Sequence, residues 1–114
     1  MFLLCDENFD EHIANAVRRS SDHVVESVRP YAPRGVPDEE VLAVAARLSA
    51  VLLTHDISTL VPIVARRMLA GFDAPRVILV VKDTAPSVAA QDILIALGAG
   101  GSNDWDAGVI YVPL

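Results

Sequence analysis

The stretch FLLCDENF, residues 2–9, changes character at its midpoint. Its first four residues are apolar, as in a strand that is buried on both faces of a parallel sheet. Two acids, Asp6 and Glu7, and then Asn8 follow directly. The run therefore predicts a buried strand over residues 1–5 that places negative charge at the point where the chain leaves the sheet.

A helix is expected immediately after these acids, from residue 8 to about residue 20. Apolar residues recur at every fourth position from Phe9 onward, which gives this helix one inward-facing stripe. Asn8 and Glu11 have the spacing of a capping box, in which the two side chains satisfy backbone N–H groups at the helix start. Strand and helix together form a first β–α unit.

The rest of the chain repeats this alternation of apolar strands and helices. We expect strands at 23–28, 51–54, 76–81 and 108–114, and helices at 37–50, from Ser58 or Thr59 to about 70, and at 86–97. Ser58 or Thr59 is the expected cap of the second of these helices, with Leu60, Val64 and Met68 facing inward. Gly98 is expected to end the third, and a turn-rich loop is expected at 100–106. Helices that alternate with fully apolar strands indicate an α/β fold. The prediction is a three-layer α/β/α sandwich around a central, mostly parallel five-stranded sheet.

The length of the chain predicts a single domain over residues 1–114, because 114 residues can bury one core without disulfides. The chain is 53% apolar and 21% charged, as in a folded globular protein. The sequence has no apolar run of membrane-spanning length and no export signal, and its one cysteine fits a reducing compartment, so we expect a cytoplasmic protein without membrane contact. A net charge of −6 argues against binding of nucleic acid through a broad basic face.

Acidic residues recur where the predicted strands end. Asp6 follows the first strand, Asp56 follows the third, and Asp38 opens the helix that leads into the third. In a parallel sheet these positions meet at one edge, where the ligands of α/β proteins bind. Three carboxylates at one edge repel one another unless a hard divalent cation lies between them. The pattern predicts metal-dependent hydrolysis of phosphodiesters, with these three aspartates as metal ligands and catalytic residues.

Each of these residues also has a purely structural interpretation. Asp38 stands in the first turn of a helix, where acids favour the helix dipole, and Asp6 and Asp56 are placed to cap the helices that follow them. Thr54 is placed to orient Asp56 or to contact a phosphate, unless it is an ordinary strand-end residue. His55, next to Asp56, is either a residue at the edge of the site or an ordinary surface histidine, and we expect the latter.

Three motifs, in order along the chain, resemble a known family. FLLCDEN at residues 2–8, GVPDEEVLAVA at residues 35–45 and VLLTHD at residues 51–56 together resemble a short family of PIN-like domains related to the VapC kind of toxin ribonuclease. The resemblance is clear over roughly residues 1–82 and continues by topology beyond them. It implies a PIN-like sandwich, an RNA-cleaving site that uses Mg²⁺ or Mn²⁺, and a toxin that pairs with a small antitoxin encoded by an adjacent gene. It also implies a homodimer.

By position, the resemblance assigns the three aspartates named above to the acids of the family's site. Asn8 matches the asparagine of the family's D-E-N motif. Arg34 lies in a loop that often carries a basic residue beside the site, where a guanidinium would suit a phosphate. Asn8, Arg34 and Thr54 are therefore the expected substrate-binding residues.

The chain departs from the family pattern in two places. A further glutamate, expected on a helix between the first two acids, has no clear equivalent, and Glu26 stands in a strand instead. After the T-x-D motif, relatives continue with an acid and a phenylalanine, whereas this chain has ISTL at residues 57–60. The segment VVKD adds Lys82 and Asp83 at the same sheet edge. These departures leave open an inactive PIN-like module that only binds.

A receiver domain of a signalling pathway is a further alternative. It would use Asp56 as the phosphate acceptor, with Asp6 and Glu7 binding Mg²⁺. A receiver also needs a lysine after its fifth strand, whereas here Lys82 follows the fourth. The receiver interpretation also leaves Asn8 without a role.

Overall fold

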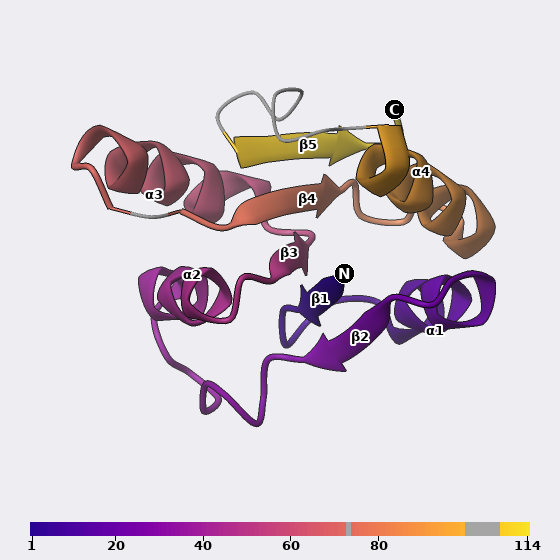
Figure 1. Ribbon diagram of the computed structural model, residues 1–114, viewed down its shortest axis with the longest axis horizontal. Helices are drawn as coiled ribbons and strands as arrows, with labels where there is room; N and C mark the ends of the chain where they lie inside the picture. The colour runs from indigo at the N-terminus through magenta and orange to yellow at the C-terminus, as the bar shows by residue number, and fades with distance from the viewer. Residues whose placement is uncertain (73, 100–107) are drawn as a thin grey trace.

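The computed structural model describes residues 1–72, 74–99 and 108–114. Within these residues, strands and helices alternate strictly along the chain, in the order that the sequence predicts (Figure 1). The elements are β1 (Phe2–Cys5), α1 (Glu11–Ser20), β2 (Val24–Ser27), α2 (Asp38–Arg47), β3 (Val51–Thr54), α3 (Ile57–Leu69), β4 (Arg76–Val80), α4 (Pro86–Ala99) and β5 (Val109–Val112).

The strands of the described chain form one five-stranded sheet in the order β2-β1-β3-β4-β5. Every neighbouring pair is parallel, so the sheet is parallel throughout. The sequence of each strand fits its place: all residues of the central strand β3 are buried, whereas Val25 is the one buried residue of the edge strand β2. The predicted α/β fold with five strands is confirmed.

Helices cover both faces of the sheet, with α1 and α4 on one face and α2 and α3 on the other (Figure 1). Successive strand residues point to opposite faces and so enter two separate cores. Leu3 and Leu53 belong to the core beneath α1 and α4. Leu4 and Leu52 belong to the core beneath α2 and α3. This arrangement is the three-layer sandwich that the sequence predicts.

The first helix begins later than expected. Its cap is Asp10, whose carboxylate accepts a hydrogen bond from the backbone N–H of His12 at 2.8 Å, so the predicted capping box of Asn8 and Glu11 is wrong. The cause is a turn before the helix, in which the N–H of Phe9 donates to the carbonyl of Asp6 at 3.0 Å. This turn buries the Phe9 ring in the core and leaves Asn8 exposed outside the helix.

The third helix also begins on a different residue. Asp56 caps α3 by accepting a hydrogen bond from the backbone N–H of Thr59 at 3.2 Å, whereas Ser58 or Thr59 was the expected cap. The structural interpretation of Asp56 is thus correct. Leu60 is buried as predicted, but Met68 stands in the last turn and is exposed.

The last elements differ from prediction only at their ends. α4 continues through Gly98 to Ala99. The expected loop at 100–106 lies outside the described residues. None of the helices in the described ranges has the length and apolar character that crossing a lipid bilayer requires.

Candidate functional site

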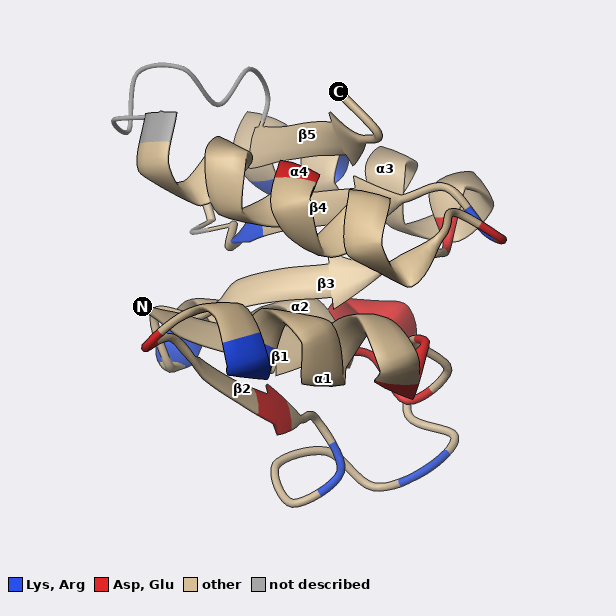
Figure 2. Ribbon diagram, turned by 90° about the vertical axis from the view of Figure 1, so that its right-hand side faces the viewer, with Lys and Arg blue, Asp and Glu red and all other residues tan. Residues whose placement is uncertain are grey.

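Polar side chains gather at the carboxyl edge of the sheet. Asp6 directly follows β1, His55 and Asp56 follow β3, Lys82 comes just after β4, and α2 begins at the same edge. Acidic positions in the first turn of α2 and in the segment between β1 and α1 lie side by side there (Figure 2). A cavity of about 300 Å³ opens at this edge, and its lining residues are Asp6, Glu7, Asn8, Asp38, His55, Asp56 and Lys82.

Asp6 is the most enclosed acid of the cavity. One of its carboxylate oxygens accepts a hydrogen bond from the backbone N–H of Glu7 at 2.8 Å, and the other accepts from the Thr54 hydroxyl at 3.0 Å. Burial raises the pKa of Asp6, and the nearby charges of Asp38 and Glu7 raise it further, against the lowering effect of the two hydrogen bonds. The ionised form of Asp6 is therefore less favourable in this site than in water.

Asp38 and Asp56 come from different helices and meet at one hydroxyl. The Oγ1 atom of Thr59 lies 2.6 Å from Oδ2 of Asp38 and 2.5 Å from Oδ2 of Asp56. The hydrogen bond from Thr59 lowers the pKa of Asp56, so this acid is ionised more readily than an ordinary aspartate. The two carboxylates are therefore close neighbours in the cavity wall.

Thr54 does not have the substrate contact that the sequence analysis gave it. Its side chain is completely buried. Its hydroxyl donates to Asp6 and accepts a hydrogen bond from the backbone N–H of Asp56 at 3.1 Å. Because the hydroxyl is enclosed and already engaged, Thr54 positions the two acids instead of touching a phosphate.

The two other predicted substrate contacts lie in different places. Asn8 is exposed and lines the cavity, so it stands where a substrate in the cavity would reach it. Arg34 is exposed on the loop between β2 and α2 and is not among the residues that line the cavity. The structure brings Asn8 to the acids and leaves Arg34 outside them, and a substrate contact of either residue stays a prediction.

His55 lines the cavity but serves as a connector between strand ends. Its Nδ1 atom lies 2.8 Å from the carbonyl oxygen of Val80, and its Nε2 atom accepts the backbone N–H of Asp10 at 3.1 Å. The ring is also stacked on Phe9, with centroids 4.6 Å apart. Both ring nitrogens are therefore hydrogen-bonded to backbone groups of the protein. The expectation of a surface histidine is wrong, because these contacts leave the side chain half-buried.

Besides His55, two residues of the cavity, Glu7 and Lys82, were not among the predicted site residues. Glu7 is exposed in the wall next to Asp6 and adds a fourth acid. Lys82 is exposed and, within the described chain, is the one lysine or arginine that lines this cavity. The signal for both was available, since each follows a predicted strand at the edge where strand ends converge.

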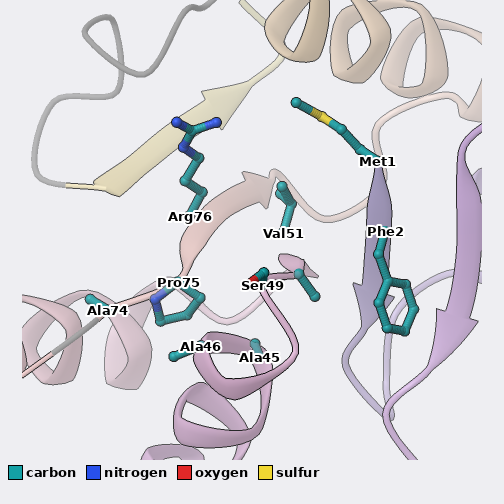
Figure 3. A pocket seen from close by; sticks show the side chains of 10 residues that line it. Met1, Phe2, Ala45, Ala46, Ser49, Val51, Ala74, Pro75 and Arg76 are labelled. Atoms are coloured by element: carbon teal, nitrogen blue, oxygen red, sulfur yellow. The ribbon is translucent and has the colours of Figure 1, made fainter.

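A second cavity lies at the opposite edge of the sheet (Figure 3). Its volume is about 410 Å³, and Met1, Phe2, Ala45, Ala46, Ser49, Ala50, Val51, Ala74, Pro75 and Arg76 line it. No acid or histidine is among these residues. Although this cavity is the larger one, its side chains offer little chemistry, so the candidate site is the acidic cavity at the carboxyl edge.

The first part of this chain matches a known family. A model of the PIN-like domain family matches residues 1–65, which is more than half of the chain. This chain belongs to the PIN-like domain family. No curated protein and no solved structure matches it.

The matched part of this PIN-like domain contains all three candidate aspartates, and Lys82 lies beyond it. The match favours the PIN-like interpretation over the receiver one. The sequence agrees, because β5 is followed by Pro113 and Leu114 and not by a lysine.

PIN-like domains commonly bind a divalent metal, and the cavity offers the right kind of donor atom. Carboxylate oxygens predominate in its wall, as Mg²⁺ and Mn²⁺ prefer, and the His55 nitrogens are already engaged. Over residues 1–72, 74–99 and 108–114, however, no three acidic, histidine or cysteine side chains stand close enough together to hold one ion. Asp38 and Asp56 form a close pair, because both carboxylates are hydrogen-bonding partners of the Thr59 hydroxyl. Asp6 is near enough for the charge of Asp38 to raise its pKa. The residues that could hold such an ion are therefore the pair of Asp38 and Asp56, with Asp6 as a third acid beside them.

Proposed function

We propose that this PIN-like domain is a metal-dependent ribonuclease and the toxin of a toxin–antitoxin pair. The observation that carries the proposal is that Asp6, Asp38 and Asp56, from three separate segments of the chain, line one cavity. Helix capping accounts for one carboxylate at each helix start. It does not account for the gathering of these acids, with Glu7 beside them, against their mutual repulsion.

The aspartates, Asn8 and Lys82 have different roles in this proposal. The three aspartates would hold Mg²⁺ or Mn²⁺, while Asn8 and Lys82 would contact the RNA backbone. A bound divalent ion lowers the pKa of a water ligand and offsets the charge that develops on a phosphoryl group. His55 would not act as a general base, because both of its ring nitrogens are hydrogen-bonded within the protein.

The charge of the chain makes RNA binding dependent on cations. Its net charge is −6, and four acids line the cavity, so an RNA phosphate approaching alone is repelled. A bound cation and the ammonium group of Lys82 supply the local attraction that the rest of the surface lacks. Arg34 would add a phosphate contact outside the cavity. We therefore expect RNA binding to require the divalent ion.

One observation favours a second candidate function, a PIN-like module that binds without cleaving. Within the described residues, the acids are not close enough to form a three-ligand metal site as they stand. An acid on a helix between Asp6 and Asp38, expected from the family, is also missing from the cavity wall, where Glu7 is the additional acid. A module of this kind would keep the fold and lose turnover.

An RNA cleavage assay separates these two functions. Single-stranded RNA is incubated with the protein in Mn²⁺, in Mg²⁺ and in EDTA, and the same assay is run on Asp6→Asn, Asp38→Asn and Asp56→Asn. Cleavage should require the metal and fall roughly 100-fold or more in each variant. Glu39→Gln is the matched control, because Glu39 is an exposed acid that follows Asp38 in α2 but does not line the cavity. Equal activity in all proteins would refute the nuclease, and no activity in any, with RNA still bound, would favour the binding module.

A small antitoxin from an adjacent gene and a second copy of this chain are the proposed protein partners. Co-expression with the neighbouring reading frame, followed by size-exclusion chromatography with light scattering, tests both. A 1:1 or 2:2 complex would support the toxin assignment. Separate elution of the two proteins at micromolar concentration would remove it, while leaving the nuclease proposal to the cleavage assay.

A further inference from the structure

The hydroxyl of Thr59 stands between two acids of the cavity. Thr59 lies in the first turn of α3, and its Oγ1 atom is within hydrogen-bonding distance of both Asp38, the first residue of α2, and Asp56, the cap of α3. The backbone N–H of Thr59 also donates to Asp56. Thr59 thus holds Asp56 by two groups and reaches Asp38 with one of them.

A threonine hydroxyl has one proton and can donate it to only one carboxylate at a time. The other carboxylate then faces the hydroxyl oxygen without a proton between them. Two negative charges this close repel each other, and the single proton does not offset both. The arrangement is therefore most favourable when an additional positive charge lies beside the pair.

From this geometry we infer that Thr59 is a positioning residue for a divalent cation, and that its hydroxyl presets the separation of the Asp38 and Asp56 carboxylates. The inference rests on the proposed metal-dependent function. It also concerns the segment where this chain departs from its family, because ISTL at residues 57–60 stands where the resemblance leads us to expect an acid and a phenylalanine.

The matched comparison is Thr59→Val against Thr59→Ser. Valine keeps the branched shape and the backbone N–H that Asp56 caps, but it lacks the hydroxyl. Serine keeps the hydroxyl and lacks the methyl group. Ser58→Ala is a second control, because the Ser58 hydroxyl contacts Asp56 alone, at 3.3 Å.

Mn²⁺ binding to the purified full chain is measured by titration calorimetry, without RNA. We expect Thr59→Val to weaken Mn²⁺ binding roughly tenfold or more, as removal of groups that orient metal ligands does, and Thr59→Ser and Ser58→Ala to stay within about twofold of the wild type. Thermal unfolding in EDTA shows whether each variant is folded. If Thr59 had only a structural role, Thr59→Val would lower the unfolding temperature and leave Mn²⁺ binding by the folded protein unchanged.

A metal-free measurement tests the same inference independently. Carboxyl-carbon NMR shifts in EDTA should change for both Asp38 and Asp56 in Thr59→Val, and for Asp56 alone in Ser58→Ala. Wild-type Mn²⁺ affinity in Thr59→Val would overturn the inference and leave the proposed function intact. Absence of Mn²⁺ binding by the wild type would overturn both.

Discussion

Thr54 donates its hydroxyl to Oδ2 of Asp6 at 3.0 Å, although the two residues are 48 positions apart in the sequence. The contact joins the ends of two neighbouring parallel strands, β3 and β1. Since Thr54 is completely buried, its hydroxyl is a fixed part of the protein interior on which an acid of the cavity depends.

Replacing Thr54 should therefore lower the free energy of unfolding and change the pKa of Asp6. Thr54→Val leaves the Asp6 oxygen and the Asp56 N–H without this partner, and we expect a loss of about 1–3 kcal/mol in the free energy of unfolding. Thr54→Ser keeps the hydroxyl and should lose only about 1 kcal/mol for the missing methyl group. Urea unfolding in EDTA measures both. Equal losses in the two variants would show that the hydroxyl is not what matters.

Substitutions of Asp56 should separate its capping role from its proposed chemistry. Asp56→Ala removes the cap of α3 and should lower stability by about 1 kcal/mol, whereas Asp56→Asn retains a capping oxygen and should change stability little. RNA cleavage should be lost in both. Asp10→Ala and Asp10→Asn provide a control pair, because Asp10 caps α1 and does not line the cavity. Retained cleavage in Asp56→Asn would leave Asp56 as a cap only.

The pKa shifts of Asp6 and Asp56 predict opposite dependences of stability on pH. The pKa of Asp6 is raised in the folded chain, so its contribution to stability is present at acid pH and lost as the pH rises through the folded pKa. The pKa of Asp56 is lowered, so its contribution is present above the unfolded pKa and lost as the pH falls through the folded value.

Carboxyl-carbon NMR titration of the metal-free protein checks this order directly. Asp6 should titrate above the ordinary value of 3.8 and Asp56 below it. Thr54→Val should raise the pKa of Asp6 further, because the hydrogen bond from Thr54 lowers it. Titration of Asp56 at a higher pH than Asp6 would contradict the geometry described for both acids.

Lys82 should contribute to RNA binding without contributing to metal binding. Lys82→Ala is expected to weaken RNA binding and to reduce the slope of log K against log salt concentration by roughly 0.7, the value for one phosphate contact on a single strand. Fluorescence anisotropy in Mn²⁺, with all three aspartates in place and a cleavage-resistant phosphorothioate-linked RNA, measures this. Arg47→Ala is the control, since Arg47 is an exposed cation in the last turn of α2, whose first turn reaches the cavity. An equal effect of the two substitutions would mean that Lys82 acts only through net charge.

Cys5 should be unreactive in the folded protein. Its side chain is buried in the core, and burial raises the pKa of the thiol to about 12. Because the thiolate is the reactive form, a disulfide reagent at pH 8 should label Cys5 only as fast as the chain unfolds. Labelling in increasing urea, followed by mass spectrometry, provides the rate. Complete labelling within seconds in native buffer would show that the first strand is accessible.

Local sequence patterns predicted the elements well and their first residues less well. Runs made almost entirely of apolar residues marked β1, β3 and β4, because a strand covered on both faces buries nearly every side chain. The predicted start of the first helix at Asn8 was wrong, because the first residue with a capping side chain after a strand is not always the cap. Phe9 is buried in a turn that precedes α1, so the helix begins later and Asp10 is its cap.

The candidate site was predictable in its acids and not in its contacts. Asp6, Asp38 and Asp56 follow from the rule that parallel strands end at one edge. The same rule extends to Glu7 and Lys82, which were seen in the sequence and not counted as part of the site.

The sequence alone determined that this chain forms alternating strands and helices with carboxylates at the strand ends, because hydrophobic periodicity and chain direction are local properties. Tertiary structure alone decided that Thr54 is enclosed beneath Asp6, that His55 is engaged at both nitrogens, and that Thr59 reaches two acids. These contacts join segments whose separation depends on strand order and packing, and no local pattern specifies such a distance.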